Sequence, residues 1–340
     1  TYSSEASFPE IVGPDLTHNG GIDAFVAKVA PDGSHLVYAG YIGGSGRDYG
    51  WSIAVDHAGN AYVTGLMTDS LGTFPVAVGP DLTFNGPNFD AFITKVSADG
   101  TELVYSGSIG GGWSDRAYGI AVDAWGRAYV TGHTYSWPAF NFPVTVGPDL
   151  TYNNNTDAFV ARVAADGTHL EYAGYIGGAH GEFGRDIAVD TQGRAYVTGY
   201  TASTEGSFPV TVGPDFTHNG RRDAFVARVS PDGCCLEYAG YIGGSGEDYG
   251  YGIAVDTLGH AYVTGYTYSD ETTFPVRFGP DITFNGGWDA FVVKVAADGS
   301  ELDYAGYVGG SSHDYGYGIA VDPLGHAYVS GTTKSNQTTF

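Results

Sequence analysis

A short stretch of oxygen-bearing side chains recurs five times along the chain, and its spacing suits the binding of a cation. The first copy, DLTHNGGID, places Asp15, Thr17, Asn19 and Asp23 at loop positions 1, 3, 5 and 9, with glycine at position 6. Alternating oxygen ligands around a glycine are the pattern of the first part of an EF-hand calcium loop. Carboxylate, hydroxyl and amide oxygens suit calcium rather than zinc or copper. The sequence therefore predicts calcium as a cofactor of these loops.

The other four copies carry the same residue types, and the second copy is one residue longer. Their predicted calcium ligands are Asp81, Thr83, Asn85 and Asp90; Asp149, Thr151, Asn153 and Asp157; Asp215, Thr217, Asn219 and Asp223; and Asp281, Thr283, Asn285 and Asp289. The pattern departs from an EF-hand because threonine replaces an acid at position 3 and no glutamate follows at position 12. The alternative is a network of Asx turns that only orders a long loop.

Two further charged positions recur with the loop. One acid stands just before the expected innermost strand of each repeat, where it either caps backbone N–H groups or contributes to a ring of ligands at a channel mouth; these acids are Asp48, Asp115, Glu182, Asp248 and Asp314. A base follows Asp23 and its equivalents, and we expect a structural ion pair between the two; these bases are Lys28, Lys95, Arg162, Arg228 and Lys294.

The elements that position these residues form a unit of about 66 residues that is used five times. Its marks are the motifs DAF, which begins at Asp23, and IAVD, which begins at Ile53, and both recur in every repeat. Within one unit the pattern predicts four short strands, at 50–56, 60–67, 23–29 and 35–44. The strands are almost continuously apolar, as expected where both faces of a sheet are covered.

Four antiparallel strands repeated radially predict an all-β, five-bladed β-propeller. We expect one domain over 1–340, in which 23–44 and 317–332 form a single shared blade. Pairing the N-terminal outer strands with the C-terminal inner strands closes the ring and leaves no bare sheet edge.

The repeat GIAVDTLGHAYVTGYT…FP…DAFVVKVAADGSELDYAGYVGG resembles the SBBP-type β-propeller repeat of bacteria and archaea. The resemblance covers essentially the whole chain. It implies an extracellular or cell-surface propeller, of a kind that mostly has no assigned activity. The family name suggests seven blades, so the blade number here depends on the count of five repeats.

Composition excludes several function classes. The net charge is −24, with only 14 lysines and arginines, which argues against nucleic-acid binding. No run of about 20 apolar residues exists, so we expect no membrane span. Because residue 1 is threonine and no basic-then-apolar leader is present, we expect a processed or excised form of a secreted protein.

The sequence offers three sites for covalent modification. Cys234 and Cys235 are neighbours, either as reduced surface thiols or in a vicinal or intermolecular disulfide. Asn154 and Asn336 begin glycosylation triplets.

Catalysis is not expected, because a single active site must break the five-fold repetition. A glycosidase needs two carboxylates at a fixed separation. Among the acids outside the repeated positions, only Asp186 and Glu247 are expected near the axis, and they belong to different repeats. No Ser/His/acid arrangement or His-rich metal motif occurs among the ten histidines.

The leading functional prediction is a non-enzymatic structural or adhesive surface protein that assembles with copies of itself into a filament, sheath or matrix. A lectin with up to five equivalent glycan sites is the second hypothesis. A five-bladed glycosidase is the third.

Overall fold

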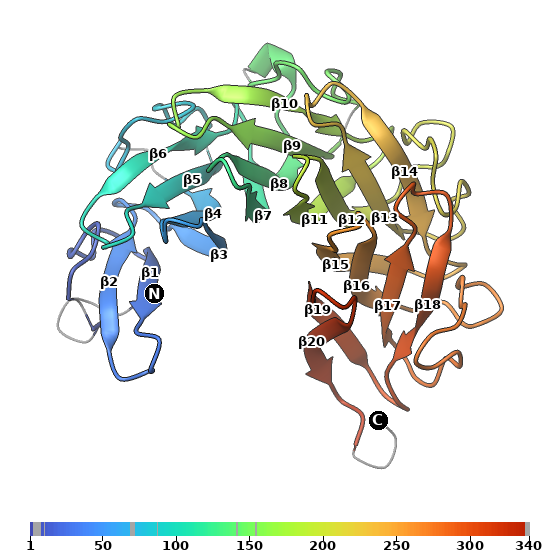
Figure 1. Ribbon diagram of the computed structural model, residues 1–340. Coiled ribbons are helices and arrows are strands. Elements are labelled where there is room, and N and C mark those ends of the chain that lie inside the picture. Colours follow the sequence, from blue (N-terminus) through green and yellow to red (C-terminus); the bar gives the residue numbers. More distant parts are fainter. Residues whose placement is uncertain are drawn as a thin grey trace. The chain divides into compact units, whose positions relative to one another are not determined.

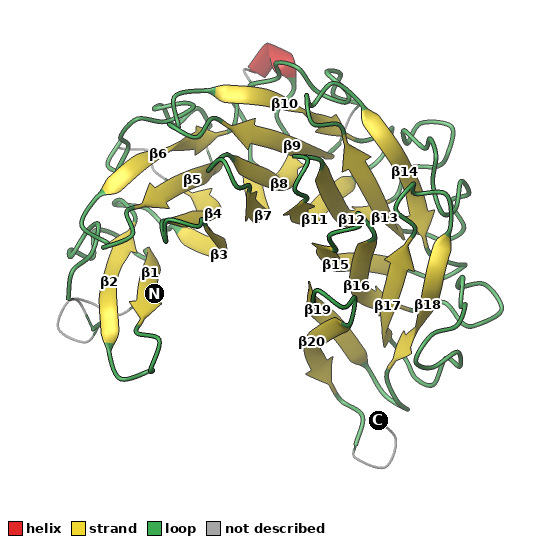
Figure 2. Ribbon diagram, viewed as in Figure 1, coloured by secondary structure: helices red, strands yellow, loops and turns green. Residues whose placement is uncertain are grey.

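The computed structural model describes residues 1–2, 8–9, 11–68, 72–86, 88–140, 142–153 and 155–336. These residues form twenty strands and one 3-10 helix, Pro138–Phe140. Figure 2 shows that strands and loops make up almost everything drawn. No helix in this part of the chain has both the length and the apolar character needed to cross a membrane. The all-β prediction is confirmed.

The strands form six sheets (Figure 1), four of them four-stranded and two of them two-stranded. The two-stranded sheets are β1 (Ala24–Val29) with β2 (Leu36–Ile42), and β19 (Asp314–Val321) with β20 (Ala327–Thr333). The four-stranded sheets are β3 (Tyr49–Val55), β4 (Ala61–Met67), β5 (Asp90–Val96) and β6 (Leu103–Ile109); β7 (Asp115–Val122), β8 (Ala128–Thr134), β9 (Asp157–Val163) and β10 (Leu170–Ile176); β11 (Glu182–Val189), β12 (Ala195–Thr201), β13 (Asp223–Val229) and β14 (Leu236–Ile242); and β15 (Asp248–Val255), β16 (Ala261–Thr267), β17 (Asp289–Val295) and β18 (Leu302–Val308).

Neighbouring strands pair in antiparallel fashion with the same register in each repeat. In β16 and β17, Ala261 lies opposite Val295 and Thr267 lies opposite Asp289. Strands β4 and β5, and β12 and β13, repeat this register. The buried Thr264 hydroxyl adds a bond across the pair by donating to the carbonyl of Phe291 at 2.7 Å. The predicted four antiparallel strands per repeat are thus confirmed, within two residues at each end.

Contacts divide the chain into two compact units, Thr1–Thr145 with Ala161–Gly174, and Val146–Val160 with Tyr175–Phe340. Within the second unit, residues of β13 and β14 pack against β16 and β17 in one buried cluster that includes Val226, Tyr238, Val263 and Phe291. Both faces of the central strands are therefore buried, as their continuous apolar character predicts. The prediction of a single domain over 1–340 is not tested and stays a prediction.

The predicted shared blade is not confirmed. Residues 23–44 and 317–332 are all described, and they make two separate sheets, β1 with β2 and β19 with β20. Strands β1 and β20 each pair only with their hairpin neighbour, so each keeps one long edge without a partner strand. Ring closure and the number of blades are consequently not confirmed.

Adjacent sheets make contact through a tyrosine and a turn glycine. Gly299 lies in the turn between β17 and β18 with φ +81°, and a Cβ at this position would overlap the ring of Tyr238 from the preceding sheet. Tyr38 packs in the same way on Gly100, and Tyr105 packs on Gly167. Glycine is required at these turns both for the left-handed backbone and for the close approach of the ring.

We predict that Gly299→Ala destabilises the protein more than Gly325→Ala. Both glycines have a left-handed backbone (φ +81° and +84°), but the nearest atom to a Cβ at Gly325 is the Tyr262 hydroxyl at 3.2 Å. We expect the backbone term to cost about 1 kcal/mol in each variant, and overpacking on the Tyr238 ring to add about 1–3 kcal/mol in Gly299→Ala alone. Thermal unfolding followed by circular dichroism measures the difference. Equal destabilisation of the two variants would contradict this packing.

Candidate functional site

The oxygen-rich loops are held together by their own hydrogen bonds. In the last copy, Asp281 Oδ1 accepts from the backbone N–H of Thr283 at 2.9 Å. Asn285 donates from its side chain to Asp281 Oδ2 and from its backbone to Asp289 Oδ2, both at 2.8 Å. The asparagine therefore links the first and last acids of the loop.

The other four copies make the same set of bonds. In each of them the first acid accepts from the threonine backbone and the asparagine side chain, and the last acid accepts from the asparagine backbone; the first acids are Asp15, Asp81, Asp149 and Asp215. These bonds match the Asx-turn alternative. Calcium binding by the loops is not tested by them and stays a prediction.

The last acid of each loop lies at the start of the third strand of its repeat and is fully buried. These strand-three aspartates are Asp23, Asp90, Asp157, Asp223 and Asp289. One carboxylate oxygen of each is taken by the loop asparagine. The other, Oδ1, has no hydrogen-bond partner among the described residues in four of the five: Asp23, Asp90, Asp157 and Asp289. In the fifth, Asp223, Oδ1 accepts from the backbone of Gly220 at 3.2 Å. Burial raises the pKa of Asp90 to about 8.

The acid before the first strand of each repeat is also buried, and its role differs. Asp248 accepts from the Gly244 backbone at 2.8 Å, from the Ser269 hydroxyl at 2.9 Å and from the Thr267 hydroxyl. These donors come from the loop before β15, the end of β16 and the connection that follows it. Such strand-one acids (Asp48, Asp115, Glu182, Asp248 and Asp314) are at most 1% exposed. Their carboxylates accept from backbone N–H groups of the preceding loop, as the capping alternative predicts.

In three repeats the two kinds of buried acid both approach one glycine, namely Gly110, Gly243 or Gly309. A Cβ at Gly309 would lie 3.1 Å from Asp289 Oδ1 and 3.1 Å from Asp314 Oδ2. Burial and the negative charge of Asp314 raise the pKa of Asp289 to about 6. Two carboxylates this close cannot both remain ionised without a proton or a cation to offset their charge.

The expected ion pair between Asp23-type acids and the following base is wrong. Residues five apart on a strand point to opposite faces, so the two side chains cannot meet. The base instead lies near another acid: Arg228 Nε is 2.7 Å from Glu237 and Lys294 Nζ is 3.6 Å from Asp303.

The two non-repeated acids that the sequence places near the axis, Asp186 and Glu247, each have partners of their own. Asp186 accepts from the backbone N–H groups of Ile187 and Ile253, each at 2.9 Å, and so ties β11 to β15. Glu247 accepts from the Tyr249 hydroxyl at 3.1 Å and lies 3.5 Å from Arg221. The sequence shows that Asp186 is exceptional, but only the structure shows that both of its oxygens are used by backbone donors.

The cysteines lie in the turn between β13 and β14. Cys234 and Cys235 are free and exposed, with their sulfur atoms 3.1 Å apart. Together with Asp232 they are the one group of three ligand-type side chains in the described residues that lie close enough to share a metal ion. The predicted glycosylation site at Asn154 lies outside the described residues, and only Asn336 of the second triplet lies within them.

Comparison with known proteins identifies the repeat. The family model SBBP, described as a beta-propeller repeat, matches residues 37–66, 171–206, 237–271 and 303–336. The protein named regulatory protein FlaEY from Caulobacter vibrioides is 28% identical over 317 residues, which are 89% of this chain and 32% of that protein. The chain thus spans about a third of the length of this curated relative.

Two solved structures are similar at low identity. Hydrazine synthase of Kuenenia stuttgartiensis is 13% identical with a TM-score of 0.47, covering 94% of this chain and 71% of its own. A protein of unknown function from Dyadobacter fermentans is 12% identical with a TM-score of 0.43, covering 82% of this chain and 73% of its own.

We predict that Asp186→Gly reduces the loss of stability between pH 4 and pH 6. Burial raises the pKa of Asp186 to about 6, above the ordinary value of 3.8. The folded state therefore binds this proton more tightly than the unfolded state, and the resulting stabilisation is lost as the pH rises through about 6. We expect the decrease in the free energy of unfolding between pH 4 and pH 6 to be smaller in the variant, by about 2–3 kcal/mol at most. Glycine is the residue that three other repeats carry at this position.

Urea unfolding at a series of pH values measures the effect in both proteins. The same slope with pH in the wild type and the variant would contradict the prediction.

Proposed function

We propose that this protein, which carries β-propeller repeats of the SBBP family, is a non-enzymatic, extracellular structural or adhesive protein that assembles with copies of itself. The observation that carries this proposal is a pair of incomplete sheets whose exposed faces complement each other. Strands β19 and β20 resemble the inner half of a complete sheet, and β1 and β2 resemble its outer half. Joined between two copies, they make one composite blade.

The apolar side chains of β1 are exposed where their equivalents are buried. Phe25 is 52% exposed, whereas the same residue in the four complete sheets is 0% exposed: Phe92, Phe159, Phe225 and Phe291. Val29 is 59% exposed, against 0% for Val229. Covering one such phenylalanine is worth about 1.5–3 kcal/mol.

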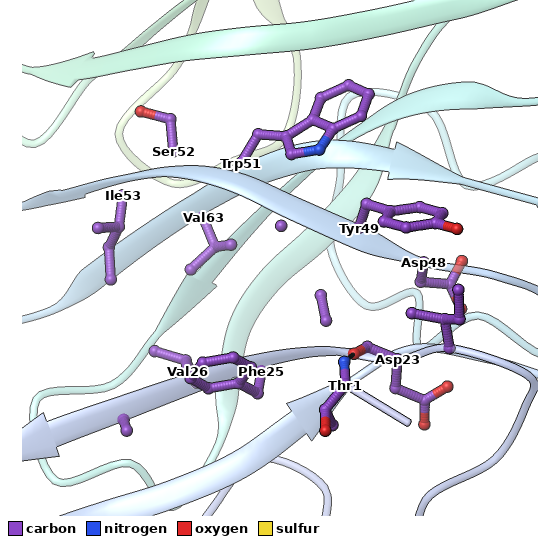
Figure 3. A pocket seen from close by; sticks show the side chains of 14 residues that line it. Thr1, Asp23, Phe25, Val26, Asp48, Tyr49, Trp51, Ser52, Ile53 and Val63 are labelled. Atoms are coloured by element: carbon purple, nitrogen blue, oxygen red, sulfur yellow. Dashed lines mark hydrogen bonds between the residues drawn. The ribbon is translucent and has the colours of Figure 1, made fainter. Parts of the chain in front are cut away.

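A hollow of about 390 Å³ adjoins β1. Figure 3 shows Val26 of β1, Ile53 of β3 and Val63 of β4 among its lining residues. Ile53 is 55% exposed, whereas Ile253 of a complete sheet is 4% exposed. The first unit thus lacks an apolar neighbour on this side.

The second unit has the matching hollow at β20. It measures about 460 Å³ and is lined by Val292, Tyr304, Ala327 and Val329, among others. In the preceding pair of sheets the equivalent residues lie in one cluster with Phe291, which is the counterpart of Phe25. Phe25 of another copy therefore has the size and character to fill this hollow.

The register of the composite blade follows from the complete ones. By analogy with β16 and β17, Ala327 would lie opposite Val29, and Thr333 opposite Asp23. At the end of this edge the backbone N–H of Asp23 already donates to the Thr1 carbonyl at 3.3 Å. Thr333 of the incoming strand must therefore displace Thr1, and the rest of this edge of β1 has no partner strand.

Two further contacts are incomplete at the same places. Three tyrosines equivalent to Tyr304 (Tyr38, Tyr105 and Tyr238) each pack on a turn glycine of the next sheet. The equivalent glycine for Tyr304, Gly33, has no atom within 4 Å of its Cβ position. Tyr262 donates to the carbonyl of Gly325 at 3.4 Å, while its counterpart Tyr328 is 61% exposed. A composite blade would supply both missing partners.

Four complete sheets and one composite blade give five blades for each copy. The same pairing made within one chain would close a five-bladed ring, whereas pairing between chains adds copies head to tail. The sequence AYVSGTT of β20 carries no charge. The joint is therefore compatible with a protein of net charge −24.

We predict that the wild type associates in a concentration-dependent manner and that Val329→Lys does not. The substitution places a charge where the composite blade would bury an apolar side chain. Leu324→Lys is the matched control, because Leu324 is 83% exposed and its equivalent in a complete sheet, Leu258, is also exposed at 73%. Sedimentation velocity measures all three proteins.

Two outcomes count against the proposal. A wild type that stays monomeric at every concentration would overturn assembly through these edges. Equal association of Val329→Lys and the wild type would overturn the composite blade.

We also predict that Gly33→Ala weakens association while leaving the isolated chain folded. A Cβ at Gly33 meets nothing within 4 Å in one copy, but it would overlap the Tyr304 ring of the next copy. We expect at least a tenfold weaker association constant, which corresponds to about 1.4 kcal/mol. Gly325→Ala carries a similar backbone strain away from the joint, and its unchanged association is the control.

A lectin is the second candidate, and one aromatic cluster favours it. Trp113, Trp137 and Phe140 are each 36–42% exposed, and the rings of Trp137 and Phe140 lie 4.3 Å apart. Exposed aromatic faces can stack on sugars. A glycan array tests this candidate, with Trp137→Ala as the control for binding at this cluster.

A further inference from the structure

The strand-three aspartates contain buried oxygens for which neither the loops nor the caps provide a donor. Asp289 is 0% exposed, and its Oδ1 has no hydrogen-bond partner among the described residues. The same is true of Asp90 and Asp157. An unpaired buried carboxylate oxygen is costly, so its repetition indicates a missing positive partner.

Other oxygen atoms converge on the same place. A Cβ at Gly286 would lie 3.0 Å from Asp289 Oδ1 and 2.6 Å from the Gly310 carbonyl oxygen, and it would also contact the carbonyl oxygen of Ser312. Gly86 shows the same grouping, with Asp90 Oδ1 at 3.1 Å and the carbonyl oxygens of Trp113 and Gly111 at 2.5 and 3.4 Å. Each group consists of acceptors alone.

The second buried acid approaches this group of oxygens. Asp314 Oδ2 lies as close to the Cβ position of Gly309 as Asp289 Oδ1 does, at 3.1 Å. In this repeat Asp314 Oδ1 also has no hydrogen-bond partner among the described residues. Two carboxylates and two carbonyl groups thus meet in one buried region.

Among the described residues, no positive side chain acts on Asp289 or Asp90. The charged groups that act on Asp289 are Asp314 and Asp281, and both are negative. Asp90 likewise has only Asp115 and Asp81 near it. The negative charge in each repeat is therefore balanced by something other than a lysine or arginine of the same chain.

We propose that each of these buried groups holds a hard cation such as Ca²⁺, bound by the strand-three aspartate, by the carbonyl groups of the loop before the first strand, and by the strand-one acid. For the last repeat the ligands are Asp289, Gly310, Ser312 and Asp314. Carboxylate and carbonyl oxygens in an irregular cage are the ligands of Ca²⁺, whereas Mg²⁺ demands an octahedron and retains several waters.

This site differs from the EF-hand-like set that the sequence predicts. Only the last acid of the loop remains a ligand. The other residues position it, because the backbone of Asn285 holds Asp289 Oδ2 at 2.8 Å and leaves Oδ1 facing the carbonyl groups. The loop recurs because each repeat with an unpartnered strand-three aspartate would hold its own cation.

The test measures Ca²⁺ binding to protein first stripped with chelator, in the Val329→Lys background so that association does not interfere. Isothermal titration gives the number of bound ions, and terbium luminescence sensitised by nearby tyrosines reports the same sites independently. We expect Ca²⁺ to raise the melting temperature. We expect Asp289→Asn to lose one equivalent of bound ion, and Asp289→Asn with Asp90→Asn to lose two.

Asp298→Asn is the matched control, since it removes one charge from an exposed turn of the same repeat. Circular dichroism verifies that each variant is folded, and the Asp90→Asn single variant replaces any that is not. An unchanged number of bound ions in Asp289→Asn would overturn the proposal. So would a stripped protein that binds no Ca²⁺ and whose melting temperature rises on Asp289→Asn, because a shared proton would then balance the charge.

Discussion

Each sheet of this protein is apolar on both faces, and the rest of the structure depends on that constraint. A four-stranded sheet with Phe, Val, Ile and Tyr on either side cannot end against water, so every sheet needs a neighbour on each side. In the complete sheets, central strands such as β5 and β13 are buried throughout. Strands β1 and β20 are not, and the exposed Phe25 and Tyr328 mark what they lack.

Close packing of the sheets is favourable for their apolar faces but unfavourable for the buried acids. Close packing of the sheets brings charged groups into the interior, where each must be offset. The strand-one acids are offset by hydroxyl and backbone donors from three segments, as at Asp248. In four of the five strand-three aspartates, by contrast, only one carboxylate oxygen accepts a hydrogen bond, from the backbone of the loop asparagine. The assembly and the cation binding that we propose would thus both follow from stacking sheets that carry a polar loop at one end.

Much of the fold could be predicted because the repeat supplies five copies of one pattern. Strand positions and antiparallel pairing follow from hydrophobic runs and turn residues, which act locally. Ring closure could not be predicted, because the pattern shows that two half-sheets fit together but not whether they belong to the same chain.

The candidate site was only partly predictable for a related reason. Spacing identifies Asp23 and its equivalents as potential ligands. It does not reveal that the Asp15 carboxylate already accepts hydrogen bonds from Thr17 and Asn19. The carbonyl groups near Gly286 carry no sequence signal, because any residue has a carbonyl. Likewise, the predicted ion pair between Asp23 and the following base is wrong because the two side chains point to opposite faces of the strand, although their charges are opposite.

Hydrogen exchange of the edge strands tests the central claim most directly. We expect the amides of Ala24–Val29 and Ala327–Thr333 to become protected together as the protein concentration rises, while those of β5 and β16 remain equally protected throughout. Amides of both edge strands that exchange rapidly at every concentration would contradict the account.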